Sequence, residues 1–241
     1  MDSCLIGKAC VEKLVAQGAA VAALDINPAI NSTYKQSDIL GIECDVTNNE
    51  QLQQAIEKTV AHFGGLDMLI SNAGMFPKSY AIKDMDDGTW EKSMQLNVTS
   101  HQKLLQLCLP YLELGIDPAI VIIGSKNVPA PGPGASAYSV AKAGLTQLGR
   151  IAAFEFGGKG IRVNMLHPNA VYDTGIWTDD ILQARAAHYG LTVKEYKTNN
   201  VLKTEVSSNN VADMAVSMLG PVFSKTTGAQ IPIDGGNERV I

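Results

Sequence analysis

The chain has 241 residues, of which 46% are hydrophobic and 18% charged, with a formal net charge of -5. This acidic balance, without any basic run, argues against nucleic acid or an anionic membrane as a partner. The longest apolar runs fall well below the ~20 residues that a membrane helix needs, and no signal segment opens the chain. We therefore expect a cytoplasmic protein whose partner is a small molecule. Its four cysteines, Cys4, Cys10, Cys44 and Cys108, are expected to be free buried thiols.

Strand and helix patterns alternate along the chain, which is typical of a parallel sheet with helices on both faces. Predicted strands cover 20–24, 41–44, 66–70, 119–123, 161–165 and 229–233. Predicted helices cover 4–17, 49–63, a long stretch through Asn97 toward Leu112, a stretch through Tyr138 toward Phe156, a helical excursion over 179–197, and 209–219. No linker or break in composition divides residues 1–241. The expected fold class is α/β, a doubly wound parallel sheet in three αβα layers, forming one domain.

The beginning of the chain departs from this pattern. Such folds open with a strand and a glycine-rich turn, where the N-terminus of a helix binds phosphate. Here residues 4–9 occupy the turn and keep only Gly7, while Leu5 stands where a glycine would let the backbone approach phosphate. The first strand and most of the turn are thus lacking. Absence of this strand would leave two neighbouring strands with an unpaired edge. Either the sequence starts at an internal Met, or the protein is a shortened form.

Asp25 ends the first predicted strand and lies eighteen residues after Gly7. This is close to the ~20-residue spacing at which an acidic side chain binds the adenosine ribose of a dinucleotide. A carboxylate there would repel a 2′-phosphate, and no Lys or Arg follows before Lys35. The pattern favours NAD over NADP as the cofactor. An aspartate that only starts the turn toward Pro28 is the alternative.

Tyr138 and Lys142 are four residues apart, so on a helix both side chains project from one face. Tyrosine normally ionises near pH ~10, and a nearby lysine cation favours the phenolate, which makes the phenol a usable acid or base. Ser125 follows the apolar run 119–123 by two residues, and its hydroxyl could hold an oxygen beside the tyrosine. The Tyr–Lys spacing is also common on helix surfaces, so the pair alone does not decide the function.

Further motifs surround this pair in a fixed order. They are Cys44-Asp45-Val46, Ser71-Asn72-Ala73-Gly74, Asn97 in Leu-Asn-Val-Thr, Ser125, Ala137-Tyr138-Ser139-Val140-Ala141-Lys142, and Ile233-Asp234-Gly235-Gly236. Over nearly all 241 residues, their order and spacing resemble the short-chain dehydrogenase/reductase family. The resemblance implies a Rossmann-like fold.

The same resemblance implies an NAD-dependent oxidoreductase that interconverts a secondary alcohol and a carbonyl. Tyr138 would exchange a proton with the substrate oxygen while hydride moves to or from the nicotinamide. Lys142 would lower the pKa of the tyrosine and bind the nicotinamide ribose, Ser125 would orient the oxygen, and Asn97 would hold a water that links Lys142 to solvent. Besides Tyr138 and Lys142, the implied cofactor-binding residues are Gly7, Asp25, Asp45, Val46, Asn72, Ala73, Gly74, Pro168 and Val171.

Structural roles remain alternatives for two of these motifs. Asn97 is also interpreted as a helix asparagine bonded to backbone, and Asn72-Ala73-Gly74 as an ordinary loop. No other catalytic group is indicated, because Ser125 lacks a Gly-x-Ser-x-Gly context and no His/Cys/carboxylate cluster has metal spacing. No catalytic metal is expected. The histidines, which carry no signature of a base and are expected in packed or surface roles, are His62, His101, His167 and His188.

The segment after Pro168 would cover the nicotinamide and the substrate, with a lid over about 173–205. Asn169 stands where the family has glycine and Asp173 where it has threonine, so contacts to the nicotinamide from this segment are less defined. Trp177, Tyr189 and Tyr196 in the lid would either contact substrate or pack against each other.

Part of this segment, with Ser125-Lys126-Asn127, resembles the dehydrogenase part of bifunctional rhamnulose-phosphate aldolase/short-chain alcohol dehydrogenases. This implies a small hydroxylated substrate, namely a polyol, a sugar derivative or a hydroxyaldehyde. Lys126 and Asn127 would suit the binding of its hydroxyls.

The helix after Lys142 is more apolar than one buried face requires, and the family pairs this helix across a two-fold axis. We therefore expect a homodimer or homotetramer. Its apolar residues are Leu145, Leu148, Ile151, Ala152 and Phe156.

A second function stays open: a catalytically silent family member that serves as a binding or subunit-partner module because its phosphate turn is incomplete. The catalytic residues are the same in both cases, so the N-terminal turn is the feature that separates them.

Overall fold

The computed structural model describes residues 5–236. Its strands are β1 (Val21–Asp25), β2 (Ile39–Glu43), β3 (Met68–Ser71), β4 (Ala119–Ile123), β5 (Arg162–Pro168) and β6 (Gln230–Ile233). Its α-helices are α1 (Leu5–Ala16), α2 (Ile30–Thr33), α3 (Asn49–Phe63), α4 (Asp87–Met94), α5 (Ser100–Leu112), α6 (Ser136–Gly157), α7 (Asp179–His188), α8 (Val193–Lys197) and α9 (Ser208–Leu219). Short 3-10 turns cover Ile82–Asp84 (η1) and Pro221–Phe223 (η3), and a π-helical turn covers Gln95–Thr99 (η2).

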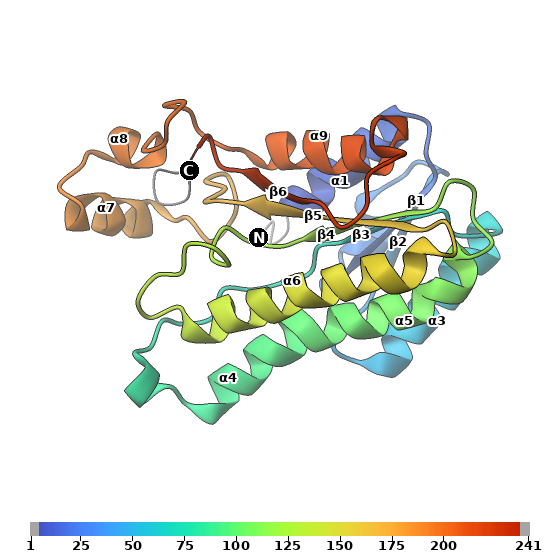
Figure 1. The fold of residues 1–241 in the computed structure, drawn as a ribbon, viewed down its shortest axis with the longest axis horizontal. Helices are drawn as coiled ribbons and strands as arrows, with labels where there is room; N and C mark the ends of the chain where they lie inside the picture. The colour runs from blue at the N-terminus through green and yellow to red at the C-terminus, as the bar shows by residue number, and fades with distance from the viewer. Residues whose placement is uncertain (1–4, 237–241) are drawn as a thin grey trace.

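All of these strands pair in parallel, β1 with β2 and β3 through β6 in sequence order. Helices α1 and α9 lie on one side of the strands, and α3, α4, α5 and α6 lie on the other (Figure 1). Helices α7 and α8 form a lobe at one end of the molecule, at the left of Figure 1. This Rossmann-like arrangement in three layers confirms the predicted α/β fold class.

Strand β4 shows why a continuous apolar run predicts a buried parallel strand. Its alternate residues Ala119, Val121 and Ile123 belong to the core on the side of α1 and α9. Between them, Ile120 and Ile122 belong to the core on the side of α3, α5 and α6. Because both faces of the strand are covered by helices, all five residues are buried.

The sheet is interrupted between β1 and β3. Among residues 5–236, β1 pairs with β2 only and β3 with β4 only. In the doubly wound strand order 3-2-1-4-5-6, the first strand lies between these two. The two unpaired edges that we expected are thus present in the described part of the chain. Their residues are also less buried than β4, with Met68 38% exposed.

The predicted elements agree with the observed ones to within a few residues at their ends, but the sequence missed some local features. The excursion 179–197 is two helices, because Gly190 adopts a positive φ of 67° and Thr192 begins α8 with a capping box. The long helix through Asn97 contains the π-helical turn η2.

Cys10, Cys44 and Cys108 are free and buried as expected, while Cys4 lies outside the described residues. In the part of the chain that the structure describes, no helix combines the length and apolarity that crossing a bilayer requires.

Candidate functional site

Helix α6 and strand β4 bring together the three side chains at the centre of the site. Tyr138 and Lys142 lie one turn apart in the first part of α6, and Ser125 lies just beyond the end of β4. The Ser125 side chain faces the Tyr138 hydroxyl and acts to lower the pKa of this phenol. The Lys142 Nζ donates to the carbonyl of Ile123 at 2.9 Å and lies 5.9 Å from the centre of the Tyr138 ring. The predicted convergence of these residues is therefore present.

Burial decides how these two groups hold their protons. It raises the pKa of Tyr138, and the Ser125 side chain only partly opposes this effect. Burial lowers the pKa of Lys142 to about 8. The expectation that Lys142 lowers the pKa of the tyrosine is thus not met, because burial disfavours the charged forms of both groups. The group of this pair that loses its proton at mildly basic pH is the lysine ammonium.

Asn97 lies on the π-helical turn η2 and is fully buried. Its Oδ1 accepts from the backbone N–H of Met75 at 3.1 Å, and its Nδ2 donates to the Met75 carbonyl at 3.1 Å and to Ser93 Oγ at 3.2 Å. Such π-helical turns are frequent at functional sites. Asn97 therefore fixes the chain directly after the Ser-Asn-Ala-Gly motif. Its side chain does bond to backbone, which was the alternative role considered for it.

Gly74 lies between Asn97 and Lys142. A Cβ at this position would be 2.9 Å from Asn97 Oδ1 and 3.4 Å from Lys142 Nζ. A side chain would crowd both groups, so a glycine here keeps a bare backbone between them. The motif at the end of β3 is thus joined to the Tyr–Lys–Ser group through Gly74.

His101 supports the same motif from behind, and its role was missed from the sequence. Its Nδ1 is 2.6 Å from Ser71 Oγ and its Nε2 is 2.8 Å from the Ala73 carbonyl. A carbonyl only accepts, so Nε2 carries the hydrogen and Nδ1 accepts from the serine. Burial, assisted by the charge of Lys142, lowers the pKa of His101 to about 3. A neutral His101 therefore bridges the two sides of this loop.

His167, at the end of β5, holds the backbone of Ser125. The Ser125 N–H donates to His167 Nδ1 at 3.2 Å, and His167 Nε2 lies 2.7 Å from Gln230 Oε1. A Cβ on Gly124 would lie 2.6 Å from Nδ1, so only glycine lets the ring approach. His167 thus has a packed role, as expected, but one directed at the candidate catalytic serine.

The residues expected to bind the adenosine and phosphate end of a dinucleotide lie on the other sheet. Gly7 is in the first turn of α1, and Asp25 ends β1. The Asp25 carboxylate accepts from the N–H of Asn27 at 2.8 Å, so it also forms the turn that was its alternative interpretation. Asp45 accepts from Thr47 at 2.9 Å (N–H) and 2.7 Å (hydroxyl), and Val46 packs against the core. Asp25 and Asp45 both lie at carboxyl ends of parallel strands, where doubly wound folds bind ligands.

The segment after β5 is held mainly by the backbone. The Pro168 carbonyl accepts from the Lys126 N–H at 2.9 Å, and Val171 is buried and bridged to Val206. Asp173 accepts from the Ser208 N–H at 3.0 Å and from its hydroxyl at 2.9 Å. This carboxylate therefore anchors the N-terminus of α9 rather than replacing a threonine in contacts to a ligand.

Two residues expected to bind substrate hydroxyls have other partners. Lys126 is 6% exposed and forms an ion pair with Asp234, so its ammonium faces away from solvent. The N–H of Asn127 donates to Ser125 Oγ at 3.1 Å, and its Oδ1 accepts from Ser139 Oγ at 3.3 Å. Direct recognition of substrate by Lys126 does not fit this arrangement.

Aromatic side chains of the α7–α8 lobe and of the segment just before it pack against each other. The Tyr172 ring lies 5.0 Å from Trp177 and 6.1 Å from Tyr196, and Tyr189 stacks on Tyr196 at 5.9 Å. Packing, one of the two roles considered for them, is thus observed.

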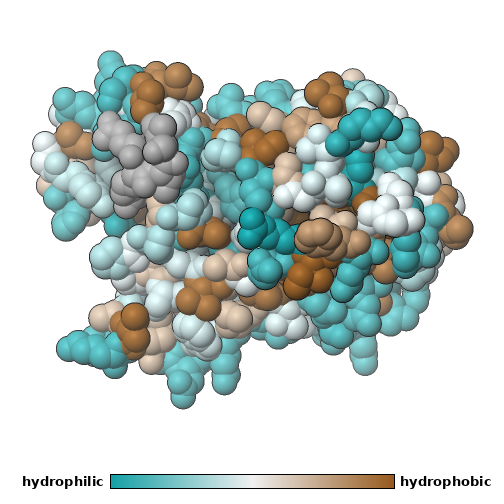
Figure 2. Space-filling view, in the orientation of Figure 1, coloured by the Kyte–Doolittle hydropathy of each residue, from teal (hydrophilic) through white to brown (hydrophobic). Residues whose placement is uncertain are grey.

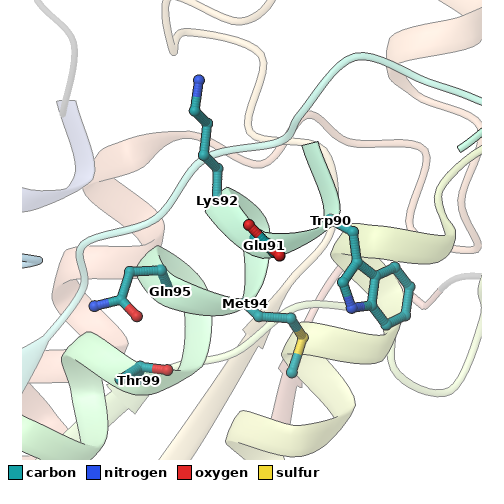
Figure 3. A pocket seen from close by; sticks show the side chains of 6 residues that line it. All are labelled: Trp90, Glu91, Lys92, Met94, Gln95 and Thr99. Atoms are coloured by element: carbon teal, nitrogen blue, oxygen red, sulfur yellow. The ribbon is translucent and has the colours of Figure 1, made fainter. Parts of the chain in front are cut away.

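A surface hollow of about 550 Å³ lies near Asn97 but on the outer side of its helix. Figure 3 shows Gln95 and Thr99, which lie at the two ends of the π-helical turn η2. The residues that line this hollow are Trp90, Glu91, Lys92, Met94, Gln95 and Thr99. None of the predicted site residues is among them, so this hollow is separate from the candidate active site.

Within 5–236, no group of three or more His, Cys, Asp or Glu side chains is arranged to hold a metal ion.

Comparison with known proteins places this geometry in a family. Residues 4–238 match a family model described as enoyl-(acyl carrier protein) reductase. The uncharacterized oxidoreductase YuxG of Bacillus subtilis is 30% identical over 245 residues, which covers 96% of this chain. The chain belongs to the short-chain dehydrogenase/reductase family. It spans 35% of the length of YuxG, so about a third of that relative is matched.

Solved structures agree with this assignment. The aldohexose dehydrogenase of Thermoplasma acidophilum, in ligand-free form, has a TM-score of 0.83 at 25% identity, covering 97% of this chain and 89% of its own. A short chain oxidoreductase of Pseudomonas aeruginosa with bound NADPH and an atypical catalytic center has a TM-score of 0.84 at 28% identity, covering 96% and 91%. The protein is an oxidoreductase of the short-chain dehydrogenase/reductase type, a family that uses NAD or NADP.

Proposed function

We propose that this short-chain dehydrogenase/reductase uses NAD to interconvert a secondary alcohol and a carbonyl on a small hydroxylated substrate. The observation that carries the proposal is the convergence of four side chains at the carboxyl ends of β3 and β4. Ser125 faces the Tyr138 hydroxyl there, and Gly74 separates Lys142 from Asn97. This arrangement offers a substrate oxygen a phenol, a hydroxyl and a route for protons in one place.

Each side chain has a distinct role in this proposal. Tyr138 exchanges the proton with the substrate oxygen, and Ser125 orients that oxygen by a hydrogen bond. Lys142, with its pKa lowered to about 8, takes up or releases the proton that Tyr138 gains or loses. Asn97 holds a water that relays this proton to solvent. The chemistry that NAD supplies when bound is hydride transfer to or from the substrate carbon.

The residues present fit a dinucleotide. Gly74 lets the backbone of the Asn72-Ala73-Gly74 loop pack directly against Asn97 and Lys142, which keeps this loop beside the candidate catalytic group. The nicotinamide end would be held by Asn72, Ala73, Gly74, Tyr138, Lys142, Pro168 and Val171. The adenosine and phosphate end would be held by the N-terminus of α1 at Gly7, with Asp25, Asp45 and Val46. The acidic Asp25 favours NAD, because its carboxylate would repel the 2′-phosphate of NADP.

The substrate class is proposed as a polyol, a sugar derivative or a hydroxyaldehyde. Support comes from the structural likeness to an aldohexose dehydrogenase and from the resemblance of segments 125–127 and 168–177 to bifunctional rhamnulose-phosphate aldolase/short-chain alcohol dehydrogenases. The lid over about 173–205 includes the lobe formed by α7 and α8. Its exposed tyrosine, Tyr189, is available to a sugar ring, with 55% of its surface exposed.

The assembly proposed is a cytoplasmic homodimer or homotetramer of one-domain subunits, without nucleic acid or membrane partners. Hydrophilic residues cover much of the face in Figure 2. Helix α6 also presents Val140, Ile151 and Phe154 to solvent, with Phe154 88% exposed. A second subunit would cover these side chains. Light scattering at micromolar concentration should show a dimer or larger species, and Phe154→Glu should weaken it; a wild-type monomer would contradict the assembly.

The function is tested by NADH formation with a panel of polyols, aldohexoses and hydroxyaldehydes. Wild-type protein should reduce NAD with at least one of them, prefer NAD to NADP, and lose the activity in Tyr138→Phe. Calorimetric titration with NAD should show binding by both proteins. Absence of NAD binding by the wild type would instead support the silent binding module considered from the sequence, because both explanations share the same catalytic side chains.

A further inference from the structure

Lys126 follows Ser125 in the chain and forms a buried ion pair with Asp234, just after β6. The two side chains are 8% and 7% exposed, whereas those of the Lys13–Asp213 pair are 36% and 57% exposed. Among the ion pairs of residues 5–236, this one alone is buried on both sides. Removing two charges from water is costly, and a buried pair is weak support for stability. We therefore expect the pair to affect the conformation of the two segments that it joins, which are the turn at Ser125 and the turn after β6.

On the lysine side, the pair holds the turn of the catalytic serine. The Lys126 N–H donates to the Pro168 carbonyl at 2.9 Å, and the next N–H, of Asn127, donates to Ser125 Oγ at 3.1 Å. The backbone of residue 126 is thus fixed to β5 and its side chain to Asp234. Any shift of Lys126 would move the hydroxyl of Ser125 relative to Tyr138.

On the aspartate side, the pair holds a glycine turn on which the proposed lid ends. Asp234 Oδ1 accepts from the Gly236 N–H at 2.9 Å, and Gly235 and Gly236 both have positive φ, 66° and 76°. The carbonyls of these two glycines accept from the N–H groups of Leu202 at 2.9 Å and Val201 at 2.8 Å. A Cβ on Gly235 would lie 2.6 Å from the Asn200 side chain, so the lid segment is in close contact with the turn.

We propose that Lys126 and Asp234 are positioning residues that couple the end of the lid to the catalytic serine. The path runs from Val201 and Leu202 through the glycine turn to Asp234, then through Lys126 to Ser125. Neither residue touches the reacting atoms. The inference rests on the proposed function, because it requires Ser125 to orient the substrate oxygen. Loss of the pair affects turnover and substrate binding, while NADH binding stays unchanged.

The first test compares Lys126→Met and Asp234→Asn with Lys13→Met, which removes a lysine from an exposed pair. The activity measured is NAD reduction with the panel substrate that the wild type oxidises fastest. Lys126→Met and Asp234→Asn should each lower kcat/KM about 10- to 100-fold, as expected for a displaced orienting group. Lys13→Met should leave it unchanged, and NADH affinity should match the wild type in all three variants.

A double-mutant cycle shows whether the effect acts through Ser125. In a Ser125→Ala background, Lys126→Met should lower the remaining activity less than about twofold, because the group it positions is gone. An equal loss in both backgrounds would overturn the proposal in favour of general destabilisation. If Ser125→Ala itself keeps wild-type activity, the proposed function fails; if it is inactive while Lys126→Met is unaffected, only this inference fails.

Hydrogen exchange of the NADH complex tests the lid side without turnover. The amides of Val201 and Leu202 should exchange about tenfold faster in Lys126→Met and at the wild-type rate in Lys13→Met, because the first loosens the turn that accepts their hydrogens. Unchanged exchange in Lys126→Met would overturn the coupling. Should the single variants fail to fold, Lys126→Met/Asp234→Leu removes both charges at once and is subjected to the same measurements, with the same expected losses.

Discussion

Strands β4 and β1 each have five residues and lie in parallel sheets, yet they differ in burial. β4 is paired on both edges and all its residues are buried. β1 is paired only with β2 in the described chain, and only Ala23 is buried. Ser125 follows β4, and Asp25 ends β1. The candidate catalytic group thus lies on the fully packed part of the molecule, and the residue proposed to bind adenosine lies on the less packed part.

This difference teaches that the candidate catalytic group and the residues proposed for the adenosine end of the cofactor rest on separate physical supports. The candidate catalytic side chains are held by β4, by η2 and by α6, which packs on β5. Asp25 and Asp45 depend on the β1–β2 pair, whose second edge has no partner strand within residues 5–236. Substitutions in one region should therefore leave the other largely intact.

The largest effect that separates the two regions is expected from Tyr138→Phe. This substitution removes the hydroxyl that exchanges a proton with the substrate oxygen, so kcat should fall about 100- to 10,000-fold. NAD affinity should change little, because the aromatic ring still packs against Phe76, whose ring centre is 4.8 Å away. Steady-state kinetics and calorimetric titration with NAD measure the two quantities. A variant that keeps most of its turnover would show that another group supplies the proton.

A pair of core substitutions compares the packing of the two regions directly. Ile122 on β4 is fully buried, while Leu24 on β1 is partly buried against the same core. Ile122→Ala should lower the free energy of unfolding by about 2–5 kcal/mol, and Leu24→Ala by no more than about 2 kcal/mol. The loss is smaller at Leu24 because folding buries less of its apolar surface. Urea unfolding of both variants gives the values. Equal losses would mean that β1 is as well packed as β4.

The ionisation of Lys142 predicts the pH dependence of the catalytic region. Its pKa is lowered to about 8, so the ammonium loses its proton as pH rises through that value. Alcohol oxidation needs a proton acceptor, so kcat/KM should rise from pH 7 to 9, with its midpoint near the pKa of about 8. At pH values below this pKa, the rise should be at most about tenfold per pH unit. Lys142→Met should remove this rise. The control Lys159→Met, which removes a lysine ion-paired with Glu113 on the surface, should preserve it. A midpoint that persists in Lys142→Met would assign the titration to another group.

The sequence could predict the elements whose signals are local. The run 119–123 specifies β4 because each of its residues is apolar and both faces must be covered. Tyr138, Lys142 and Ser125 could be predicted to meet because one strand and one helix carry them at fixed spacing. The chemistry of the pair was harder: the burial that raises the pKa of Tyr138 comes from many distant residues.

The supporting contacts could not be predicted, since they join residues remote in sequence. His101 contacts Ser71 across 30 positions, and His167 contacts Ser125 across 42. Only the position of His101, four residues after Asn97 and so on the same helix face, was a usable signal. The Lys126–Asp234 pair had no such signal, and the sequence favoured a substrate contact for Lys126 that its burial argues against.

The smallest effect expected is the pH dependence of stability from His101. Its pKa in the folded protein is about 3, lowered from 6.5, so the unfolded chain binds a proton at a higher pH than the folded one. The stability that the neutral ring provides is complete above pH 6.5 and is lost as pH falls toward 3, by about 1 kcal/mol per pH unit. His101→Gln can still donate to the Ala73 carbonyl but cannot ionise. Urea unfolding at pH 7, 6 and 5 should therefore show the wild type more stable at pH 7 and the difference shrinking toward pH 5, since the carboxylates titrate equally in both proteins. Parallel curves would mean that His101 takes up its proton without disturbing Ser71 and Ala73, and that the loop beside Lys142 is less rigid than its hydrogen bonds indicate.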